Sequence, residues 1–395
     1  MDNFTELNPV LPLGSSFHTD RDFKIIVLTG GPGSGKSSAM KRVKGWLEPL
    51  GYTVYTQAEI ATEIIAGVGL FIDDKLSLPN GVFQRFKVGY SLAKENCFVG
   101  AIKHSVAPKK VYILDRGVME DEVYAGPEMF ADILDELGLS RMDVRDRRYD
   151  AVFHLQTAGA IGDNFFSTEN NIARTEDAEL ARIRDYKTIE AWVGHRHWRM
   201  IPAMVDKEQR FDLLRRHILA ALGEPEPVEI ERKFLVKYTD PKLLTVPYST
   251  FEVEQSYLKR DSSGISPRIR SMMQGSSAMY FETRKVFKSA MESTENEKEI
   301  NLHGYLSMGL NKNPKVSTIA KHRTYFVYKD QYFELDLFDH PYNDLALMEI
   351  ELLDKSDPVN LPPFIEVVRE VTDDLRYKNS NLGRLSLGQP GNWKD

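Results

Sequence analysis

The chain has 395 residues, of which 42% are hydrophobic and 28% are charged, and its formal net charge is −7. This length exceeds what one hydrophobic core usually serves, so we expect two domains, and the composition excludes a disordered chain. The negative balance argues against nonspecific nucleic-acid binding, so no nucleic-acid partner is expected.

Targeting signals are lacking in the sequence. No stretch approaches the roughly 20 apolar residues that span a bilayer. The N-terminus has no basic region followed by an apolar run, and Asp2 stands where N-myristoylation would require glycine. The single cysteine, Cys97, is expected to be a buried helix residue. We therefore expect a cytoplasmic protein for which peripheral contact with membranes is possible. Residues 1–22 are expected to form a loose tail.

The N-terminal half alternates apolar runs with helical patterns. Strands are expected at 23–29, 52–56, 110–114 and 151–156. Helices are expected from Ser37 to Leu50, and at about 58–66, 82–104, 128–138, 175–198 and 206–221. Alternation of this kind is typical of a parallel α/β sheet flanked by helices, so residues 23–222 are predicted to form one α/β domain.

A change of texture follows the proline-containing segment 223–228, which we interpret as a linker. Strands with period-two alternation are expected at 228–236, 250–260, 265–273, 279–288, 296–302, 322–328, 331–338 and 346–353. Few helical patterns intervene. Residues 229–395 are therefore predicted to form a mainly antiparallel domain, and eight strands could close into a β-barrel.

The segment from Gly30 to Ser37 satisfies the pattern GxxxxGK[ST] between a buried strand and an amphipathic helix. In this motif backbone N–H groups surround the phosphates of a nucleoside triphosphate, the lysine reaches the β- and γ-phosphates, and the hydroxyl holds Mg²⁺. Lys36 and Ser37 take these two roles. The predicted nucleotide-binding residues are Gly31, Gly33, Ser34, Gly35, Lys36, Ser37, Ser38 and Arg116.

Three further residues of this half are candidates for catalysis. Asp115 ends a buried strand, where an acid usually approaches the metal or the nucleophile, although a capping role is the alternative. Glu59 follows the second strand and is either an acid facing an acceptor site or a solvated helix start. Arg174 lies in a polar segment that could form a lid over the transferred phosphoryl group.

These motifs resemble a known family. Residues 23–222 look like the P-loop kinase-like family related to nicotinamide-riboside and deoxynucleoside kinases. The resemblance rests on Gly30–Ser37, on Asp115-Arg116, on Tyr149-Asp150 and on Arg174-Thr175-Glu176.

Charged residues alternate along the strands of the second half. Glu229, Glu231 and Lys233 point to one face of their strand, because side chains repeat with period two. The same alternation returns at Arg268 and Arg270, Lys285, Glu297 and Glu299, Lys321 and Arg323, Glu334 and Asp336, and Glu349 and Glu351. Such repetition indicates a barrel with a charged lumen, and the alternative is a sheet with a wet outer face.

The ExExK pattern at Glu229 resembles the start of the CYTH, or triphosphate tunnel, family, and the match runs to about Leu382. By resemblance, the metal-binding acids are Glu229, Glu231, Glu349 and Glu351, and the polyphosphate-binding bases are Lys233, Arg268, Arg270, Lys285, Arg323 and Lys378. One departure is Glu295, where the family commonly has arginine. It makes binding of a triphosphate a firmer expectation than its hydrolysis.

The order of the two halves resembles the TRPL translocation defect protein family. That resemblance implies GTP or ATP binding with Mg²⁺ (or Mn²⁺), recognition of anionic phospholipid, and partners in membrane-protein trafficking. The expected function is a nucleotide-binding, hydrolysing P-loop protein whose second domain binds a polyphosphate or phosphorylated ligand with a divalent metal. The alternative is a metal-dependent triphosphatase or a small-molecule kinase.

Overall fold

The computed structural model describes residues 21–69, 78–162, 178–262, 264–339 and 341–385. The chain divides into two compact units, Met1–Arg215 and Arg216–Asp395. The division falls within helix α8 (Lys207–Leu222), which the segment predicted as a linker follows directly. Within the described residues no helix is long and apolar enough to cross a membrane.

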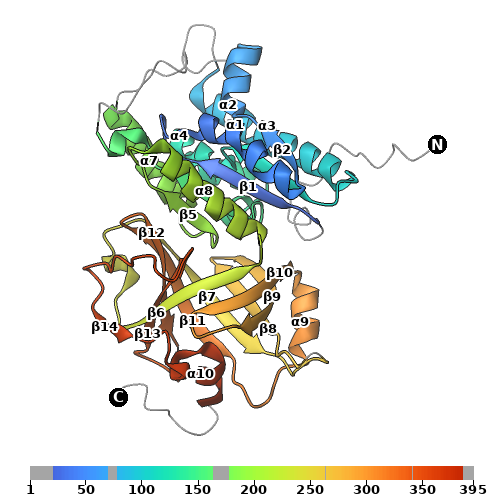
Figure 1. The fold of residues 1–395 in the computed structure, drawn as a ribbon. Coiled ribbons are helices and arrows are strands. Elements are labelled where there is room, and N and C mark those ends of the chain that lie inside the picture. The colour runs from blue at the N-terminus through green and yellow to red at the C-terminus, as the bar shows by residue number, and fades with distance from the viewer. Residues whose placement is uncertain (1–20, 70–77, 163–177, 263, 340, 386–395) are drawn as a thin grey trace, which may run out of the picture. The chain divides into compact units, whose positions relative to one another are not determined.

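The first unit is built on a five-stranded sheet with the order β2-β3-β1-β4-β5, in which every pairing is parallel. Its strands are β1 (Lys24–Thr29), β2 (Thr53–Gln57), β3 (Lys110–Asp115), β4 (Ala151–Leu155) and β5 (Trp198–Ile201). Its helices other than α8 are α1 (Lys36–Leu47), α2 (Ile60–Thr62), α3 (Asn80–Lys103), α4 (Asp121–Ala125), α5 (Pro127–Glu136), α6 (Arg141–Arg145) and α7 (Ala178–Trp192). Figure 1 shows β1 enclosed by helices.

The central position of β1 sets up the phosphate site. Its five residues after Lys24 are buried, as expected for an apolar run in a parallel sheet covered on both faces. Because β1 lies between β3 and β4, the carboxyl ends of three strands meet beside the loop that follows Thr29. In α1, Ala39, Val43 and Leu47 are buried at the spacing of one helical face, which fixes that loop against the sheet.

Three expectations for this unit were wrong in detail. The helix expected over 175–198 ends at Trp192 among the described residues, and Trp198–Ile201 forms β5, a buried strand beside β4. The helix expected to run to residue 66 is one α-turn that widens into a π-helix over Glu63–Val68. Cys97 lies on α3, as expected for a helix residue, but it is exposed.

The second unit is a closed antiparallel barrel, shown from yellow-green to red in Figure 1. Its eight strands are β6 (Val228–Val236), β7 (Tyr248–Tyr257), β8 (Arg268–Gln274), β9 (Ser277–Phe287), β10 (Glu292–Ile300), β11 (Ile319–Tyr328), β12 (Gln331–Phe338) and β13 (Ala346–Leu352). They follow the order β10-β9-β8-β7-β11-β12-β13-β6, and pairing of β10 with β6 closes the ring. The predicted α/β domain followed by a barrel is confirmed.

The barrel carries additional elements, which period-two alternation did not predict. They are the strand β14 (Val367–Glu370), which pairs with β6, and the helices α9 (Leu302–Gly309) and α10 (Asn379–Leu385).

The apolar and charged faces of the barrel wall are separated. Phe333, Leu335 and Leu337 of β12 belong to an apolar cluster that Leu244 and Ile365 complete from outside the strands. The alternate residues of the same strand, Glu334 and Asp336, therefore point to the other side of the wall. Asp336 is 0% exposed, so this side is an enclosed lumen and not a wet outer face.

Candidate functional site

The phosphate loop is formed by glycines in conformations that other residues rarely adopt. Gly33 and Gly35 have φ angles of 71° and 88°. The backbone N–H of Gly31 donates to Oδ1 of Asp185 on α7 at 2.7 Å, and a Cβ on Gly31 would lie 2.8 Å from that side chain. Thr157 donates to the carbonyl oxygen of Pro32 at 2.6 Å. The loop is therefore held from both sides.

The ammonium group of Lys36 lies inside this loop. Its Nζ donates to the carbonyl oxygens of Gly30 and Gly31, at 2.6 and 3.0 Å, and to Oγ of Ser34 at 3.0 Å. Burial, followed by the charge of Arg116, lowers the pKa of Lys36 to about 8. A cation that is satisfied only by neutral oxygens would gain from an anionic phosphate in their place.

The hydroxyl residues at the start of α1 are open to solvent. Ser37 and Ser38 are both exposed, and Gly35 immediately before the helix is in the left-handed region. The helix N-terminus and the Ser37 hydroxyl are thus accessible to a phosphate and to a hydrated Mg²⁺, whose preferred ligands are oxygens.

A carboxylate and a guanidinium connect the loop to the ends of the neighbouring strands. Asp115 pairs with Leu28 in the β3–β1 register, and Arg116 follows it with a φ of 72°. Nη1 of Arg116 lies 3.4 Å from the carbonyl oxygen of Gly30, and its Nε lies 2.6 Å from Glu59. Although burial opposes ionisation, Arg116 and Lys36 lower the pKa of Glu59 to about 2. The structure thus brings Glu59, Arg116 and the loop together, whereas Arg174 lies outside the described residues.

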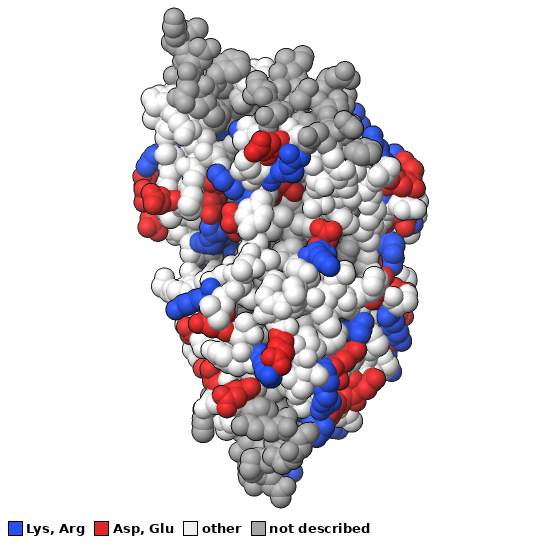
Figure 2. All heavy atoms as spheres, turned by 90° about the vertical axis from the view of Figure 1, so that its left-hand side faces the viewer, with Lys and Arg blue, Asp and Glu red and all other residues white. Residues whose placement is uncertain are grey.

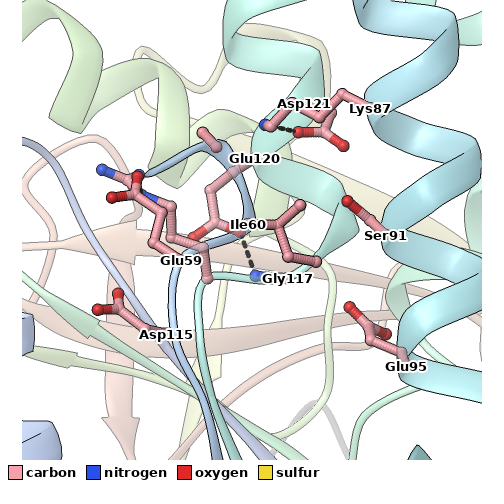
Figure 3. Close-up of a pocket in the computed structure, with 11 residues that line it drawn as sticks. Glu59, Ile60, Lys87, Ser91, Glu95, Asp115, Gly117, Glu120 and Asp121 are labelled. Atoms are coloured by element: carbon pink, nitrogen blue, oxygen red, sulfur yellow. Dashed lines mark hydrogen bonds and ion pairs between the residues drawn. The ribbon is translucent and has the colours of Figure 1, made fainter. Parts of the chain in front are cut away.

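Sequence patterns missed five polar residues that share a pocket with Asp115, Arg116 and Glu59. They are Lys87, Ser91, Glu95, Glu120 and Asp121. Figure 3 shows Lys87, Ser91 and Glu95 projecting from one helix, α3. Their spacing of four residues places them on one helical face, which is the signal that could have revealed them. Glu120 and Asp121 come after the Asp115-Arg116-Gly117 turn, separated from it by two residues.

In the second unit the predicted bases face the lumen and are paired with carboxylates. Lys233 lies 2.6 Å from Glu349, Arg268 lies 2.9 Å from Glu295, and Arg270 lies 2.8 Å from Glu297. Lys285 contacts Glu229 at 2.5 Å and Glu295 at 3.1 Å. Arg323 contacts Asp336 at 2.7 Å and Glu349 at 3.0 Å, and it also pairs with Glu334. Five of the six predicted bases therefore belong to one network of alternating charges.

The sixth predicted base, Lys378, precedes α10. Its Nζ lies 3.9 Å from the centre of the Phe287 ring. Burial and the charges of Lys233 and Lys285 lower the pKa of Lys378, so it shares their electrostatic environment. Its contact with a phosphate stays a prediction.

The network includes four acids and one base that were not predicted to bind a metal or a phosphate. They are Glu295, Glu297, Lys321, Glu334 and Asp336. The alternation along the strands had already placed Glu297, Lys321, Glu334 and Asp336 on the same faces as the predicted residues, and Glu295 had been noted only as a departure from the family pattern.

The four acids predicted to bind a metal occupy neighbouring strands. Glu231 of β6 and Glu351 of β13 are opposite each other in the register of these two strands, and Glu229 lies two residues before Glu231 on β6. Carboxylate oxygens suit Mg²⁺ or Mn²⁺ chemically. The spacing does not fit, however, because no group of three or more acids or histidines within the described ranges is arranged to hold a metal ion. Lys285 and Lys233 hold three of these carboxylates instead, those of Glu229, Glu231 and Glu349.

Comparisons with known proteins assign a likeness to each half of the chain. The family described as an AAA domain matches residues 25–210. An inorganic triphosphatase from Nitrosomonas europaea is 33% identical over 160 residues in the C-terminal region, covering 39% of this chain and 95% of that protein. Among solved structures, the crystal structure of an inorganic triphosphatase is 30% identical and covers 40% of this chain and 94% of its own, with a TM-score of 0.29. A Pyrococcus horikoshii protein is 25% identical over 33% of this chain and 80% of its own, with a TM-score of 0.25.

Proposed function

Because this chain belongs to the inorganic triphosphatase family through its C-terminal region, we propose that its barrel binds a tripolyphosphate or a similar phosphate chain. The proposal extends to the first unit, whose loop binds ATP or GTP at Lys36. The coarser statement, a P-loop-like domain joined to a triphosphatase-like domain, rests on both likenesses.

One observation carries the proposal for the barrel. Lys233, Arg268, Arg270, Lys285 and Arg323 share the lumen, and each is held by buried or half-buried carboxylates. Burying so many charges is costly, and apolar residues would stabilise an empty barrel at least as well. Such a lumen is explained if it binds a chain of phosphates, whose oxygens replace the carboxylates as partners of the bases.

Binding is favoured over rapid hydrolysis by the position of Glu295. This carboxylate holds Arg268 and Lys285, two of the bases expected to contact phosphate. We therefore propose slow turnover in the barrel.

In the first unit, Lys36 and the N–H groups of the loop would hold the β- and γ-phosphates, and Ser37 would hold Mg²⁺. The metal supplies charge neutralisation of the phosphates when it is bound. Asp115 and Arg116 would contact the phosphate end of the site, since the Arg116 guanidinium already reaches the Gly30 carbonyl oxygen.

The phospholipid and trafficking roles that the family resemblance implied are not included in this proposal. On the face shown in Figure 2, basic and acidic side chains of the described residues are interspersed. That face therefore presents no extended basic surface of the kind that anionic lipids attract.

Calorimetry on the full-length protein tests the proposal. Tripolyphosphate and ATP or GTP are titrated separately, with and without Mg²⁺, and phosphate release is followed with Mg²⁺ and with Mn²⁺. Lys36→Ala should remove only nucleotide binding, and Arg270→Ala should weaken only tripolyphosphate binding. A folded protein that binds no tripolyphosphate under either condition would overturn the function proposed for the barrel.

A further inference from the structure

A pocket with a polar lining lies beside the phosphate loop, and the proposed nucleotide binding does not account for it. It encloses about 290 Å³, open solvent at its mouth included, and lies between α3 and the turn that follows β3. Lys87, Ser91 and Glu95 line it from α3, and Figure 3 shows Glu59 and Asp115 on the side across from this helix. Its size suits a molecule of a few heavy atoms.

Arg116 joins this pocket to the phosphate loop. It lines the pocket, pairs with Glu59 at 2.6 Å and reaches the carbonyl oxygen of Gly30 at 3.4 Å. The ammonium of Lys36 donates to that same oxygen at 2.6 Å. A molecule in the pocket would therefore be a neighbour of the terminal phosphate of a nucleotide bound at Lys36.

The pocket has a surplus of carboxylates. Among its lining residues five are acids and two, Lys87 and Arg116, are cations. Lys87 pairs with Asp121 and Arg116 pairs with Glu59, while Glu95 lies 2.5 Å from Arg148 behind the pocket wall. The pocket therefore disfavours an acceptor that already carries a phosphate, because both lining cations are already in ion pairs.

Two carboxylates of the pocket keep oxygen atoms that take no part in an ion pair. Glu120 accepts from the backbone N–H of Gly117 at 2.8 Å and from Nε1 of Trp192 at 3.2 Å, which are neutral donors. The Oδ2 atom of Asp121 is buried and accepts no hydrogen bond from the described residues, although the side chain is only 3% exposed. A buried acceptor without a donor is costly, which points to a donor that the pocket receives from outside.

A metal ion is a poor occupant for this pocket. No three acids or histidines of the described parts of the chain are grouped closely enough to hold one. The carboxylates are spread around the pocket wall, as Figure 3 shows, and this arrangement suits an organic molecule with several polar groups.

We propose that the first unit phosphorylates a small amino alcohol, which binds in this pocket with its ammonium group near Asp121 and Glu120. This inference rests on the proposed nucleotide binding at Lys36. In the reaction the acceptor's hydroxyl oxygen forms a bond to the γ-phosphorus, and the bond from that phosphorus to the bridging oxygen breaks. The nucleoside diphosphate leaves, and the hydroxyl proton, oriented by the ionised carboxylate of Glu59, is released to solvent.

The electrostatics of the pocket agree with a cationic acceptor. Burial raises the pKa of Glu95, Glu120 and Asp121, because it disfavours their ionised forms. A bound ammonium would stabilise those ionised forms, and it would donate to the Oδ2 atom of Asp121. Glu59, whose pKa is about 2, is ionised at neutral pH, so it can accept a hydrogen bond that orients the acceptor's hydroxyl group.

Transfer of a labelled phosphoryl group tests the inference. Full-length protein is incubated with Mg²⁺ and ATP or GTP labelled at the γ-phosphate, together with small molecules extracted from the expression host. The extract is first separated by ion exchange into cationic, neutral and anionic fractions. Label should enter a compound of the cationic fraction. Label that enters only the neutral or the anionic fraction would overturn the inference.

Nucleotide binding is measured in parallel, so that two kinds of failure are distinguished. If the protein binds ATP or GTP by calorimetry and labels no compound in any fraction, the acceptor pocket is refuted while the proposed nucleotide binding stands. If the protein binds neither nucleotide, the proposed function of the first unit fails, and this inference fails with it.

Variants connect the transfer to the pocket. Ser91→Leu fills the pocket from α3 and should reduce transfer at least tenfold while nucleotide affinity is kept. Ala93→Leu adds a similar side chain at an exposed position of the same helix and should leave transfer unchanged. Asp121→Asn, which keeps the shape of the side chain, should raise the KM for the cationic acceptor more than it lowers kcat. Equal transfer by Ser91→Leu and wild type would refute the location of the site.

Discussion

The guanidinium of Arg268 lies 2.9 Å from the carboxylate of Glu295 inside the barrel, and Lys285 reaches the same carboxylate at 3.1 Å. Burial alone would raise the pKa of Glu295, but these two cations lower it to about 2. Glu295 is therefore ionised throughout the physiological range. It occupies the position at which the resembling family commonly has arginine, so an internal anion replaces an expected phosphate contact.

Removing this internal anion should strengthen binding of a polyphosphate. In Glu295→Gln, a phosphate no longer has to displace a carboxylate from Arg268 and Lys285. We therefore expect the affinity for tripolyphosphate to rise about tenfold, since one charge-assisted hydrogen bond contributes roughly 1.5–3 kcal/mol. Glu282→Gln is the matched control, because Glu282 pairs with the exposed Arg284. Calorimetry of the full-length variants measures both. Unchanged or weaker binding by Glu295→Gln would contradict the idea that this carboxylate competes with phosphate.

Loss of two lumen bases should have the opposite effect. Arg268→Ala combined with Arg270→Ala should weaken tripolyphosphate binding at least a hundredfold, because each lost charge-assisted contact is worth roughly 1.5–3 kcal/mol. Arg284→Ala removes a basic residue of β9 whose side chain is 45% exposed, and it should bind like wild type. If the folded double variant binds tripolyphosphate with wild-type affinity, the anion does not bind at Arg268 and Arg270.

Nucleotide binding should depend on Lys36. Lys36→Ala should weaken ATP or GTP binding at least tenfold and leave the fold intact, since a charged group that binds phosphate contributes roughly 1.5–3 kcal/mol per hydrogen bond. Lys41→Ala, at an exposed position of the same helix, is the control. Circular dichroism establishes folding and calorimetry establishes affinity. Equal affinities for the two variants would argue against the phosphate-loop assignment.

The pH dependence of anion binding should report on Glu334. Burial, together with Glu349, Glu351 and Asp336, raises the pKa of Glu334 to about 7 in spite of Arg323. Below pH 7 this carboxyl is protonated, so the lumen loses one negative charge and tripolyphosphate should bind more tightly. Above pH 7 it ionises and binding should weaken.

Titrations at pH 6 and pH 8 check this sign. Glu334→Gln should bind about equally at both values once protonation of the ligand itself is subtracted. Because a raised carboxyl pKa also stabilises the folded state at low pH, the contribution of Glu334 to stability should be present below its unfolded value of about 4.5 and lost as pH rises through 7. Wild-type binding that strengthens from pH 6 to pH 8 would contradict the assignment.

The predicted linker over 223–228 remains open to test. Limited proteolysis should cut this proline-containing segment first and give two resistant fragments. The division of the structure between Arg215 and Arg216 lies inside a helix, where the backbone is hydrogen-bonded and a protease has less access. Initial cleavage at other places, with neither fragment resistant, would count against two independently folding units.

How far the sequence predicts the structure depends on whether a feature is local. The eight barrel strands were predictable because alternation of charged and apolar residues continues along each of them, as in Glu334 and Asp336 between Phe333, Leu335 and Leu337. Strand β5 was missed because Trp198–Ile201 has only four residues, too few to show a period of their own next to a long helical pattern. Its partner β4 supplies the pairing that makes it a strand.

The same distinction applies to the sites. The phosphate loop is contiguous in sequence, so its residues could all be named, and Glu59 and Arg116 were assigned to the site because each follows the end of a predicted strand. The pocket joins Glu95 and Asp121 only through packing of α3 against the turn after β3, which no local pattern reveals. Pairing of Arg268 with Glu295 likewise depends on the position of β10 relative to β8, on the far side of β9.

The ring of strands has one short joint. β10 meets β6 only through Glu292–Ile230, Ser293–Glu229 and Thr294–Val228, because β10 begins at Glu292 and β6 begins at Val228. Farther along β6, Phe234, Leu235 and Val236 pair with β14 instead. By contrast, β10 follows β9 over eight residue pairs. A ladder with so few hydrogen bonds is the place where local opening costs least, and its amide hydrogens should exchange with solvent earliest in the wall. Glu229 accepts a hydrogen bond from Ser293 across this joint, at 3.2 Å. The charged network is therefore tied to the part of the wall that opens most readily, and a long anion could enter from the side without being threaded end-on.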